Sequence, residues 1–230
     1  MTLVLFDLDK TLLDCNSATL WVRAELRDGR IGARDALRAG WWILRYYLGL
    51  DGGGDAIRLA VARLAGEPED ELAARTERWF EREVRGRLRP GAVAAMDEHR
   101  RAGHKLVMAT AGSPYLARVA ARVWGMSDCI CTEFEVREGR FTGQVSSLAY
   151  GAHKAERVSA WALIGGEDLA QAVFYTDSIT DLALLELVGR PVVVNPDPRL
   201  KRIAQARGWE ELDWGLSTAT TGAHSPVEVK

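Results

Sequence analysis

Short apolar runs alternate with helix-like patterns over much of the chain. The runs predict four strands: 3–8, 104–111, 172–178 and 191–196. The second and third of these are apolar enough for burial on both faces. Helical spacing covers four more segments: 90–102, 114–124, 153–163 and 180–188. Strands that alternate with helices predict an α/β fold, in which helices cover both faces of a Rossmann-like parallel sheet.

A long segment near the N-terminus departs from this alternation. From Asn16 to about Arg87 no strand pattern appears, and apolar residues follow helical spacing instead. Four helices are predicted there: 17–28, 33–48, 55–65 and 69–86. The sequence DGGGD at 51–55 separates the second from the third, and Pro68 followed by three acidic residues is typical of a helix start.

These patterns divide the chain into three expected parts. Residues 1–15 and 88–215 form an α/β core, residues 16–87 form an inserted all-helical cap, and residues 216–230 form a polar C-terminal tail. Within the core, the sequence TEFEVREGRFTGQVSS predicts a β-hairpin that turns at Glu138 and Gly139.

The balance of charges narrows the class of partner. The 230 residues include 30 basic and 32 acidic ones, so the composition favours neither nucleic acid nor an anionic membrane. Met1 leads directly into a predicted strand, without the basic segment of a signal peptide. The cysteines Cys15, Cys129 and Cys131 suit buried reduced thiols. We therefore expect a cytoplasmic protein without integral membrane association, and its oligomeric state stays open.

One apolar stretch raises the question of a membrane. AGWWILRYYLGL at 39–50 is too short to span a bilayer, which takes about 20 apolar residues, and Arg45 interrupts it. It could be an amphipathic helix on a membrane surface or an aromatic helix face packed inside the protein. We favour the second interpretation.

Two aspartates end the first predicted strand. Asp7 and Asp9 follow the apolar run, with only Leu8 between them. Residues i and i+2 of an extended chain point to the same side, so the two carboxylates should converge on one spot. Carboxylates avoid burial unless they are paired or bind a metal. A divalent cation is one explanation, and a polar loop that caps a core strand is the other.

Polar residues follow the other predicted strands as well. Thr110 and Ala111 end the second strand, Asp177 and Asp181 follow the third, and Lys154 lies between them in sequence. Singly, the threonine could be a helix cap and the lysine a solvated charge. Because ligands bind at the carboxyl ends of parallel strands, the set predicts one crevice. Acids there suit Mg²⁺, and a hydroxyl, loop amides and a lysine suit phosphate oxygens, which leaves one aspartate free to attack phosphorus.

Four short motifs carry a resemblance to a known family. They are DLDKT at 7–11, MATAG around Thr110, Lys154, and TDSITD at 176–181. In this order they resemble the four motifs of the haloacid dehalogenase superfamily of phosphatases. The similarity is to the phosphoserine-phosphatase-like branch with a helical cap in the first insertion position, and it covers the chain except the tail. It implies Mg²⁺-dependent hydrolysis of a phosphomonoester through an aspartyl-phosphate.

The resemblance also implies catalytic roles. Asp7 would attack phosphorus, and Asp9 would protonate the leaving oxygen and later deprotonate the attacking water. Lys154 would pair with the phosphoryl group and Asp7. Asp181 would orient Lys154 or support a water of the metal.

Further positions would hold the metal and the substrate. The resemblance implies that Mg²⁺ is bound by Asp7, the backbone carbonyl of Asp9, and Asp177. Thr110, the amide of Ala111, and Lys154 would hold phosphate oxygens.

The chain departs from the phosphoserine pattern where the substrate would be recognised. Asn16 stands where the phosphoserine enzymes have a glutamate, and Thr180 stands where they have an asparagine. We therefore expect a different small phosphomonoester, with Asn16 contacting its leaving group. Two alternatives stay open: a phosphotransferase or phosphomutase of the same superfamily, and a non-catalytic phospho-acceptor or binding protein.

Overall fold

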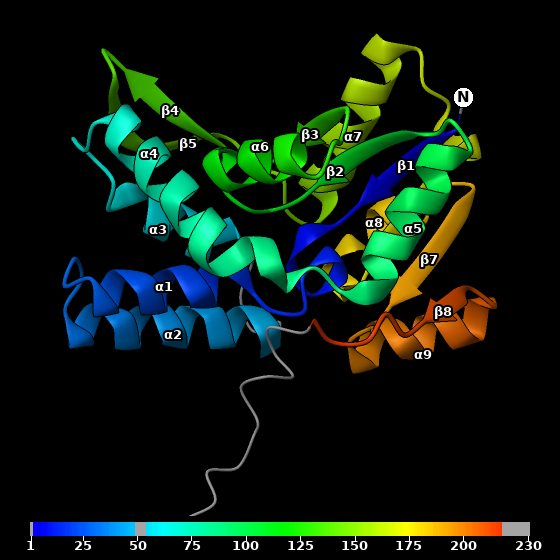
Figure 1. Cartoon of the computed structure of the whole chain (residues 1–230), viewed down its shortest axis with the longest axis horizontal. Helices are drawn as coiled ribbons and strands as arrows, with labels where there is room; N and C mark the ends of the chain where they lie inside the picture. Colours follow the sequence, from blue (N-terminus) through cyan, green and yellow to red (C-terminus); the bar gives the residue numbers. More distant parts are fainter. Residues whose placement is uncertain (1, 49–53, 218–230) are drawn as a thin grey trace, which may run out of the picture.

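Six parallel strands form the central sheet, in the order β3-β2-β1-β6-β7-β8 (Figure 1). The computed structural model describes residues 2–48 and 54–217, without the side chains of residue 39 and residues 42–48. The strands are β1 (Leu3–Phe6), β2 (Lys105–Ala109), β3 (Asp128–Ile130), β6 (Val173–Thr176), β7 (Arg190–Val194) and β8 (Glu210–Leu212). Counted along the chain within this sheet, the order is 3-2-1-4-5-6, so the direction of winding reverses between β1 and β6. Ligands of such sheets bind at the carboxyl ends of the strands at that reversal.

Alternate residues of β1 pack into opposite layers. Val4 and Phe6 belong to a buried cluster with α5 (Pro90–Arg101) and α6 (Pro114–Val123). Leu3 and Leu5 pack with three helices of the other layer: α7 (Ala152–Gly165), α8 (Leu182–Leu185) and α9 (Pro198–Arg207). Burial of both faces explains why the strand is a continuous apolar run, and the predicted α/β fold is confirmed.

Among the described residues, four α-helices lie between β1 and α5, as the sequence predicts. They are α1 (Ser17–Arg27), α2 (Ala33–Leu48), α3 (Gly54–Ala62) and α4 (Glu69–Trp79). The last is shorter than the predicted 69–86, because the chain continues as a π-helical turn at Phe80–Val84 and a 3₁₀ turn at Arg85–Arg87. In Figure 1, α1 and α2 lie side by side, outside the layers of the sheet. Trp79 and Phe80 are buried in the same cluster as Phe6, so the end of this segment packs onto the core.

The predicted hairpin is confirmed. It consists of β4 (Glu133–Arg137) and β5 (Arg140–Ser147), which pair antiparallel. Glu138 and Gly139 both have positive φ, at 50° and 72°, as a two-residue type I′ turn requires. The amide of Glu69 donates to the carbonyl of Gly139 at 2.9 Å, and the amide of Phe141 donates to that of Glu67 at 3.0 Å. The hairpin is thereby bonded to the start of α4.

The prediction of buried reduced thiols was wrong about the burial of two cysteines. Only Cys131 is buried, whereas Cys15 and Cys129 are half-buried, and all three are free thiols. Trp41 is 57% exposed, so it does not belong to an aromatic face packed inside the protein. The helix α2 that carries it contacts α1 and α3. The other aromatic side chains of the stretch lie outside the described residues.

The C-terminal region also differs from expectation. The helix predicted at 180–188 is a short turn at Ile179–Asp181 followed by α8, and the sequence prediction lacked α9 and β8. Of the predicted tail, only residues 216 and 217 are described. Ser217 is buried, and its amide donates to Asp14 Oδ2 at 2.9 Å. Within the described residues, no helix is long and apolar enough to cross a membrane.

Candidate active site

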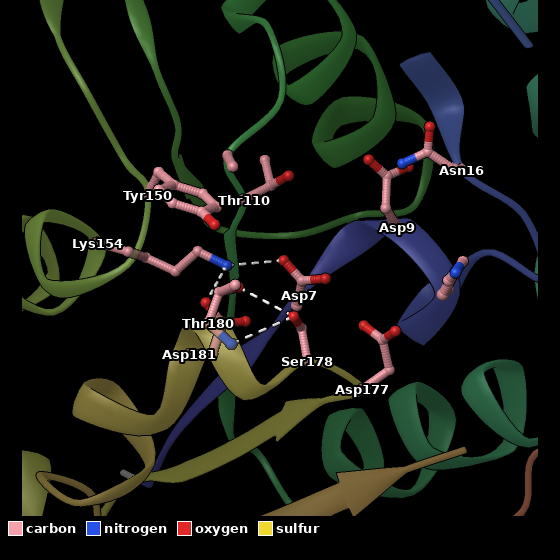
Figure 2. Close-up of a pocket in the computed structure, with 12 residues that line it drawn as sticks. Asp7, Asp9, Asn16, Thr110, Tyr150, Lys154, Asp177, Ser178, Thr180 and Asp181 are labelled. Carbon is pink, nitrogen blue, oxygen red and sulfur yellow. Dashed lines mark hydrogen bonds and ion pairs between the residues drawn. The ribbon is translucent and has the colours of Figure 1, made fainter. Parts of the chain in front are cut away.

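The loop after β1 presents the two aspartates at the middle of the sheet's carboxyl edge (Figure 2). The amide of Asp7 donates to the carbonyl of Tyr175 in β6 at 2.9 Å, which fixes the end of the strand. Leu8 is fully buried and anchors the loop between the aspartates. The carboxylate of Asp9 accepts two hydrogen bonds at the start of α1, from Ser17 N at 2.7 Å and Ser17 Oγ at 3.0 Å. The first turn of α1 therefore sets the position of Asp9.

Lys154 is the centre of a buried ion-pair network. Its Nζ lies 2.9 Å from Asp7 Oδ1 and 2.7 Å from Asp181 Oδ1, and the residue is only 3% exposed. Thr176 Oγ1 donates to the second oxygen of Asp181 at 2.7 Å. Lysine is almost never fully buried unless it is paired. The network joins the end of β1, the first turn of α7 and the turn after β6.

Two further strand ends complete the surroundings of Asp7. Asp177 follows β6 and accepts a hydrogen bond at 3.3 Å from the buried Thr11 Oγ1. Thr110 follows β2, and its hydroxyl accepts a hydrogen bond at 3.1 Å from the amide of Gly112, which shapes the loop before α6. Both Asp177 and Thr110 are buried, so the pocket has polar walls that face little solvent.

Acidic groups outnumber cations in this pocket. Its lining includes four aspartates and two lysines: Asp7, Asp9, Asp177, Asp181, Lys10 and Lys154. Burial raises the pKa of Asp7 to about 7, against the attraction of Lys154. Burial and the charge of Asp7 raise the pKa of Asp177 well above its ordinary value. Burial alone would lower the pKa of Lys154, but the charges of Asp181 and Asp7 outweigh burial and raise it. The excess negative charge suits a divalent cation.

The cavity between these groups is small. Its volume is about 40 Å³. At roughly 10–15 Å³ for each water molecule, that is room for about three waters. The space therefore matches an ion or a phosphoryl group, rather than a large metabolite.

All eight residues predicted from the sequence line this one pocket. They are Asp7, Asp9, Asn16, Thr110, Ala111, Lys154, Asp177 and Asp181. Figure 2 shows Asp9 and Asn16 on one side of Asp7, and Lys154 and Tyr150 on the other. The roles of the eight in a reaction remain predictions. The side-chain oxygen of Asn16 caps α1, accepting from Thr19 N at 2.9 Å and from Thr19 Oγ1 at 3.0 Å.

Sequence reasoning did not name four of the lining residues as site residues: Lys10, Tyr150, Ser178 and Thr180. Ser178 lies inside the fourth motif, where attention fell on the aspartates. Tyr150 lies four residues before Lys154 and outside the four motifs. A signal for it was available, because Gly151 marks a sharp turn into the helix that carries the lysine, with φ at 58°.

The oxygen donors of the pocket suit Mg²⁺ better than they suit a metal ion that takes all its ligands from side chains. Among the described residues, no three His, Cys, Asp or Glu side chains are arranged to hold a metal by themselves. Mg²⁺ needs only one or two carboxylates and takes its other ligands from water and phosphate oxygens. Asp7 and Asp177 could supply those carboxylates.

Comparisons with known proteins agree with the motifs. Residues 4–186 match the family model of the haloacid dehalogenase-like hydrolases. Phosphoserine phosphatase SerB1 of Mycobacterium tuberculosis is 31% identical, over 92% of this chain and 70% of the relative. Histidinol-phosphatase of Neisseria meningitidis is 28% identical, over 92% of this chain and 98% of the relative. A crystal structure of a protein of unknown function from Bordetella pertussis Tohama I superposes with a TM-score of 0.84 at 35% identity, over 93% of this chain and all of the other.

Proposed function

Because this chain belongs to the haloacid dehalogenase-like hydrolase family and is an enzyme of the phosphatase class, we propose that it hydrolyses a small phosphomonoester with Mg²⁺ through an aspartyl-phosphate on Asp7. The observation that carries the proposal is the placement of Lys154. Its ammonium group lies 2.9 Å from Asp7 Oδ1 in a cavity of phosphoryl size, with Asp177 and Thr110 also in the lining. Such a cation both steadies an ionised nucleophile and attracts a phosphate.

The residues that would hold Mg²⁺ are Asp7, the backbone carbonyl of Asp9, and Asp177. When bound, Mg²⁺ supplies the positive charge that allows an anionic carboxylate and an anionic phosphate to approach each other. The raised pKa values of Asp7 and Asp177 support this assignment, because burial and the neighbouring carboxylates disfavour their charged forms, which a bound cation would stabilise.

In the first half of the reaction, a carboxylate oxygen of Asp7 forms a bond to phosphorus while the bond from phosphorus to the leaving oxygen breaks. Asp9 donates its proton to that oxygen. Burial raises the pKa of Asp9, although its hydrogen bonds from Ser17 oppose the rise, and a raised pKa suits a carboxyl that must carry a proton. Lys154, Thr110 and the amide of Ala111 hold the phosphoryl oxygens during the transfer.

In the second half, Asp9 takes a proton from water as the water oxygen bonds to phosphorus. The bond between phosphorus and the Asp7 oxygen breaks, which gives inorganic phosphate and the free carboxylate of Asp7. The ion pair between Asp181 and Lys154, at 2.7 Å, keeps the lysine in place in both halves. Because Asp9 has taken a proton from the attacking water, it is protonated again and the cycle is complete.

The capping role of Asn16 bears on the leaving group. An amide oxygen has two lone pairs, and Asn16 Oδ1 already accepts from Thr19 N and Thr19 Oγ1. Only the amide NH₂, a donor, is left for a substrate. An ammonium group such as that of phosphoserine would find no acceptor in this side chain, whereas a hydroxyl or a carbonyl of a substrate could accept from it.

We also propose that residues 16–87 form a cap over the pocket, attached to a core of residues 1–15 and 88–215. Two features support this division. The helical segment begins at Asn16, which lines the pocket, and Ser17 in its first turn holds Asp9.

A screen of phosphomonoesters, each assayed with Mg²⁺ and again with a chelator, tests the proposed function. We expect at least one small phosphomonoester to be hydrolysed with Mg²⁺, and the chelated enzyme to be inactive. Equal turnover with and without Mg²⁺ would contradict the metal assignment. Retention of labelled phosphate on an organic product would indicate a phosphotransferase instead.

A further inference from the structure

A buried arginine lies behind the loop that carries Asp9. Arg89 immediately precedes α5 and is 6% exposed. Its Nε donates to the carbonyl of Lys10 at 3.1 Å, and one terminal nitrogen donates to the carbonyl of Gly215. Its own amide donates to the carbonyl of Leu12 at 2.9 Å. Arg89 therefore bonds the loop twice, through its backbone and through its side chain.

The loop needs such support at Lys10. This residue has φ at 58° and ψ at −5°, in the left-handed region that residues with a Cβ rarely adopt. Such a conformation persists only where the surroundings fix it. Two hydrogen bonds do so here: the Lys10 amide donates to the carbonyl of Cys15 at 3.0 Å, and the Lys10 carbonyl accepts from Arg89. Because Asp9 directly precedes Lys10, these bonds also set the direction of Asp9.

The other end of the arginine is bonded to a segment that is itself fixed. Trp214, next to Gly215, is buried and packs against the ring of Tyr175, with ring centres 5.2 Å apart. Its carbonyl accepts from the amide of Gly91 at 3.1 Å. A Cβ on Gly91 would lie 2.3 Å from the indole of Trp214, so only glycine permits this approach. Gly215 thus offers a fixed anchor for the guanidinium group.

Arginine suits this bridge because its planar fork fixes the directions of its N–H groups. The two bonds of Arg89 go to backbone carbonyls, and no ion pair of Arg89 with an acidic side chain is found among residues 2–48 and 54–217. Because the buried guanidinium group donates to two backbone carbonyls, it fixes the positions of the two segments that carry them.

We propose that Arg89 is a positioning residue, which holds the loop of Asp9 in its working conformation by linking the Lys10 carbonyl to the segment around Gly215. The inference rests on the proposed function, in which Asp9 moves the proton. Arg89 does not line the pocket, so its hydrogen bonds reach the site through the loop.

The test compares Arg89→Met and Arg89→Lys with Arg100→Met. Arg100 lies at the opposite end of the same helix and also donates to a backbone carbonyl, that of Trp124, so it is a matched control outside the pocket. The first readout is kcat/KM on an alkyl phosphate, whose leaving oxygen needs a proton, relative to kcat/KM on an activated aryl phosphate, because kcat/KM reports the first transfer alone. The second is amide hydrogen exchange over residues 8–15.

Arg89→Met should lower the ratio of alkyl to aryl kcat/KM by about 10–100-fold, because a misplacement of about 1 Å can cost that much. Exchange over residues 8–15 should accelerate in the same variant. Arg89→Lys, which keeps the charge and can make one of the two bonds, should show a smaller change of both. Arg100→Met should change neither readout.

An unchanged ratio in a folded Arg89→Met enzyme would overturn the proposal, because a loss of stability lowers both rates alike. Unchanged loop exchange in that variant would overturn it too. If the wild-type protein hydrolyses no phosphomonoester of the screen, the proposed function fails, and loop exchange alone decides whether Arg89 fixes this loop.

Discussion

Replacing Lys154 by methionine removes the cation that two buried carboxylates share. Methionine keeps the approximate length and volume of the lysine side chain, so the variant isolates the charge. Asp7 and Asp181 then lose a partner at 2.9 Å and 2.7 Å. Breaking a buried ion pair by removing one partner costs about 3–5 kcal/mol. Because two carboxylates are affected, we expect the free energy of unfolding to fall by about 4–5 kcal/mol at pH 8 in magnesium-free buffer.

The loss should shrink as the pH falls. With Lys154 present, the pKa of Asp7 is already raised from 3.8 to about 7 by burial, and removal of the lysine raises it further. A carboxyl whose folded pKa exceeds its unfolded value contributes stability that is complete below the unfolded pKa and is lost as the pH rises through the folded one. The variant therefore has its greatest deficit at pH 8, where the unfolded chain ionises freely and the folded site opposes ionisation of Asp7, and a smaller one near pH 5.

The assay is urea unfolding of the wild type, Lys154→Met and Lys105→Met from pH 5 to pH 8 in a chelator, followed by tryptophan fluorescence. Lys105 is the control, because it pairs with Glu167 at 2.7 Å away from the pocket, with its side chain 24% exposed. A pair of that kind contributes about 0–1 kcal/mol. A Lys154→Met protein within about 1 kcal/mol of wild type at pH 8, or one with the same deficit at pH 5 and pH 8, would refute the reasoning.

Three further expectations follow from the structure. Asp9→Asn should lower kcat/KM on an alkyl phosphate by about 10²–10⁴-fold and spare kcat/KM on an activated aryl phosphate, since kcat/KM reports the first transfer and only the alkyl leaving oxygen needs a proton there; equal losses on both would assign Asp9 another role. Phosphoserine should have a lower kcat/KM than at least one of glycerol phosphate, histidinol phosphate and phosphocholine, because the Asn16 oxygen is occupied; phosphoserine as the best substrate would contradict this. Burial and the charge of His104 lower the pKa of His99 below its ordinary 6.5, so stability should be lost as the pH falls below about 6.5. His99→Gln should flatten that slope in urea unfolding, and an unchanged slope would show that other groups cause it.

The sequence predicts the core of this fold well because the chemistry of its strands is unambiguous. Strands buried on both faces must be continuous apolar runs, and β1, β2 and β6 all are. The site follows from the same reasoning, since parallel strands bring their carboxyl ends together. Asp7, Thr110 and Asp177 are over 60 residues apart in the chain, yet they line one pocket.

The two elements that the sequence prediction lacked, β8 and α9, have no clear pattern of apolar residues. β8 is the short edge strand Glu210–Leu212. Its two glutamates are exposed to solvent, so its sequence is not an apolar run. In α9 the buried side chains are Leu200 and Ala204 alone, too few for a clear helical stripe. Its start is marked instead by Asp197, whose carboxylate accepts from the amides of Arg199 and Leu200 at 2.8 Å and 3.0 Å.

Two features of the site depend on contacts that only the folded chain shows. Asn16 was expected to contact the leaving group of the substrate, and the structure shows that its oxygen caps α1, which leaves its NH₂ group for that contact. In the sequence, Arg89 looks like any of the neighbouring arginines at 85 and 87. Only the folded chain brings the carbonyls of Lys10 and Gly215, 205 positions apart in numbering (215 − 10), to one guanidinium group.

The central claim is that the phosphoryl group passes through Asp7, and the most direct measurement is to trap it there. Asp9→Asn should still transfer a phosphoryl group from an activated aryl phosphate, which needs no proton, but should hydrolyse the product slowly because water is not deprotonated. After an acid quench, peptide mass spectrometry should find close to one phosphoryl group per chain, on Asp7. The double variant with Asp7→Asn should carry none. Release of the aryl alcohol by Asp9→Asn with no phosphorylated Asp7, or with the phosphoryl group on another residue, would contradict the account.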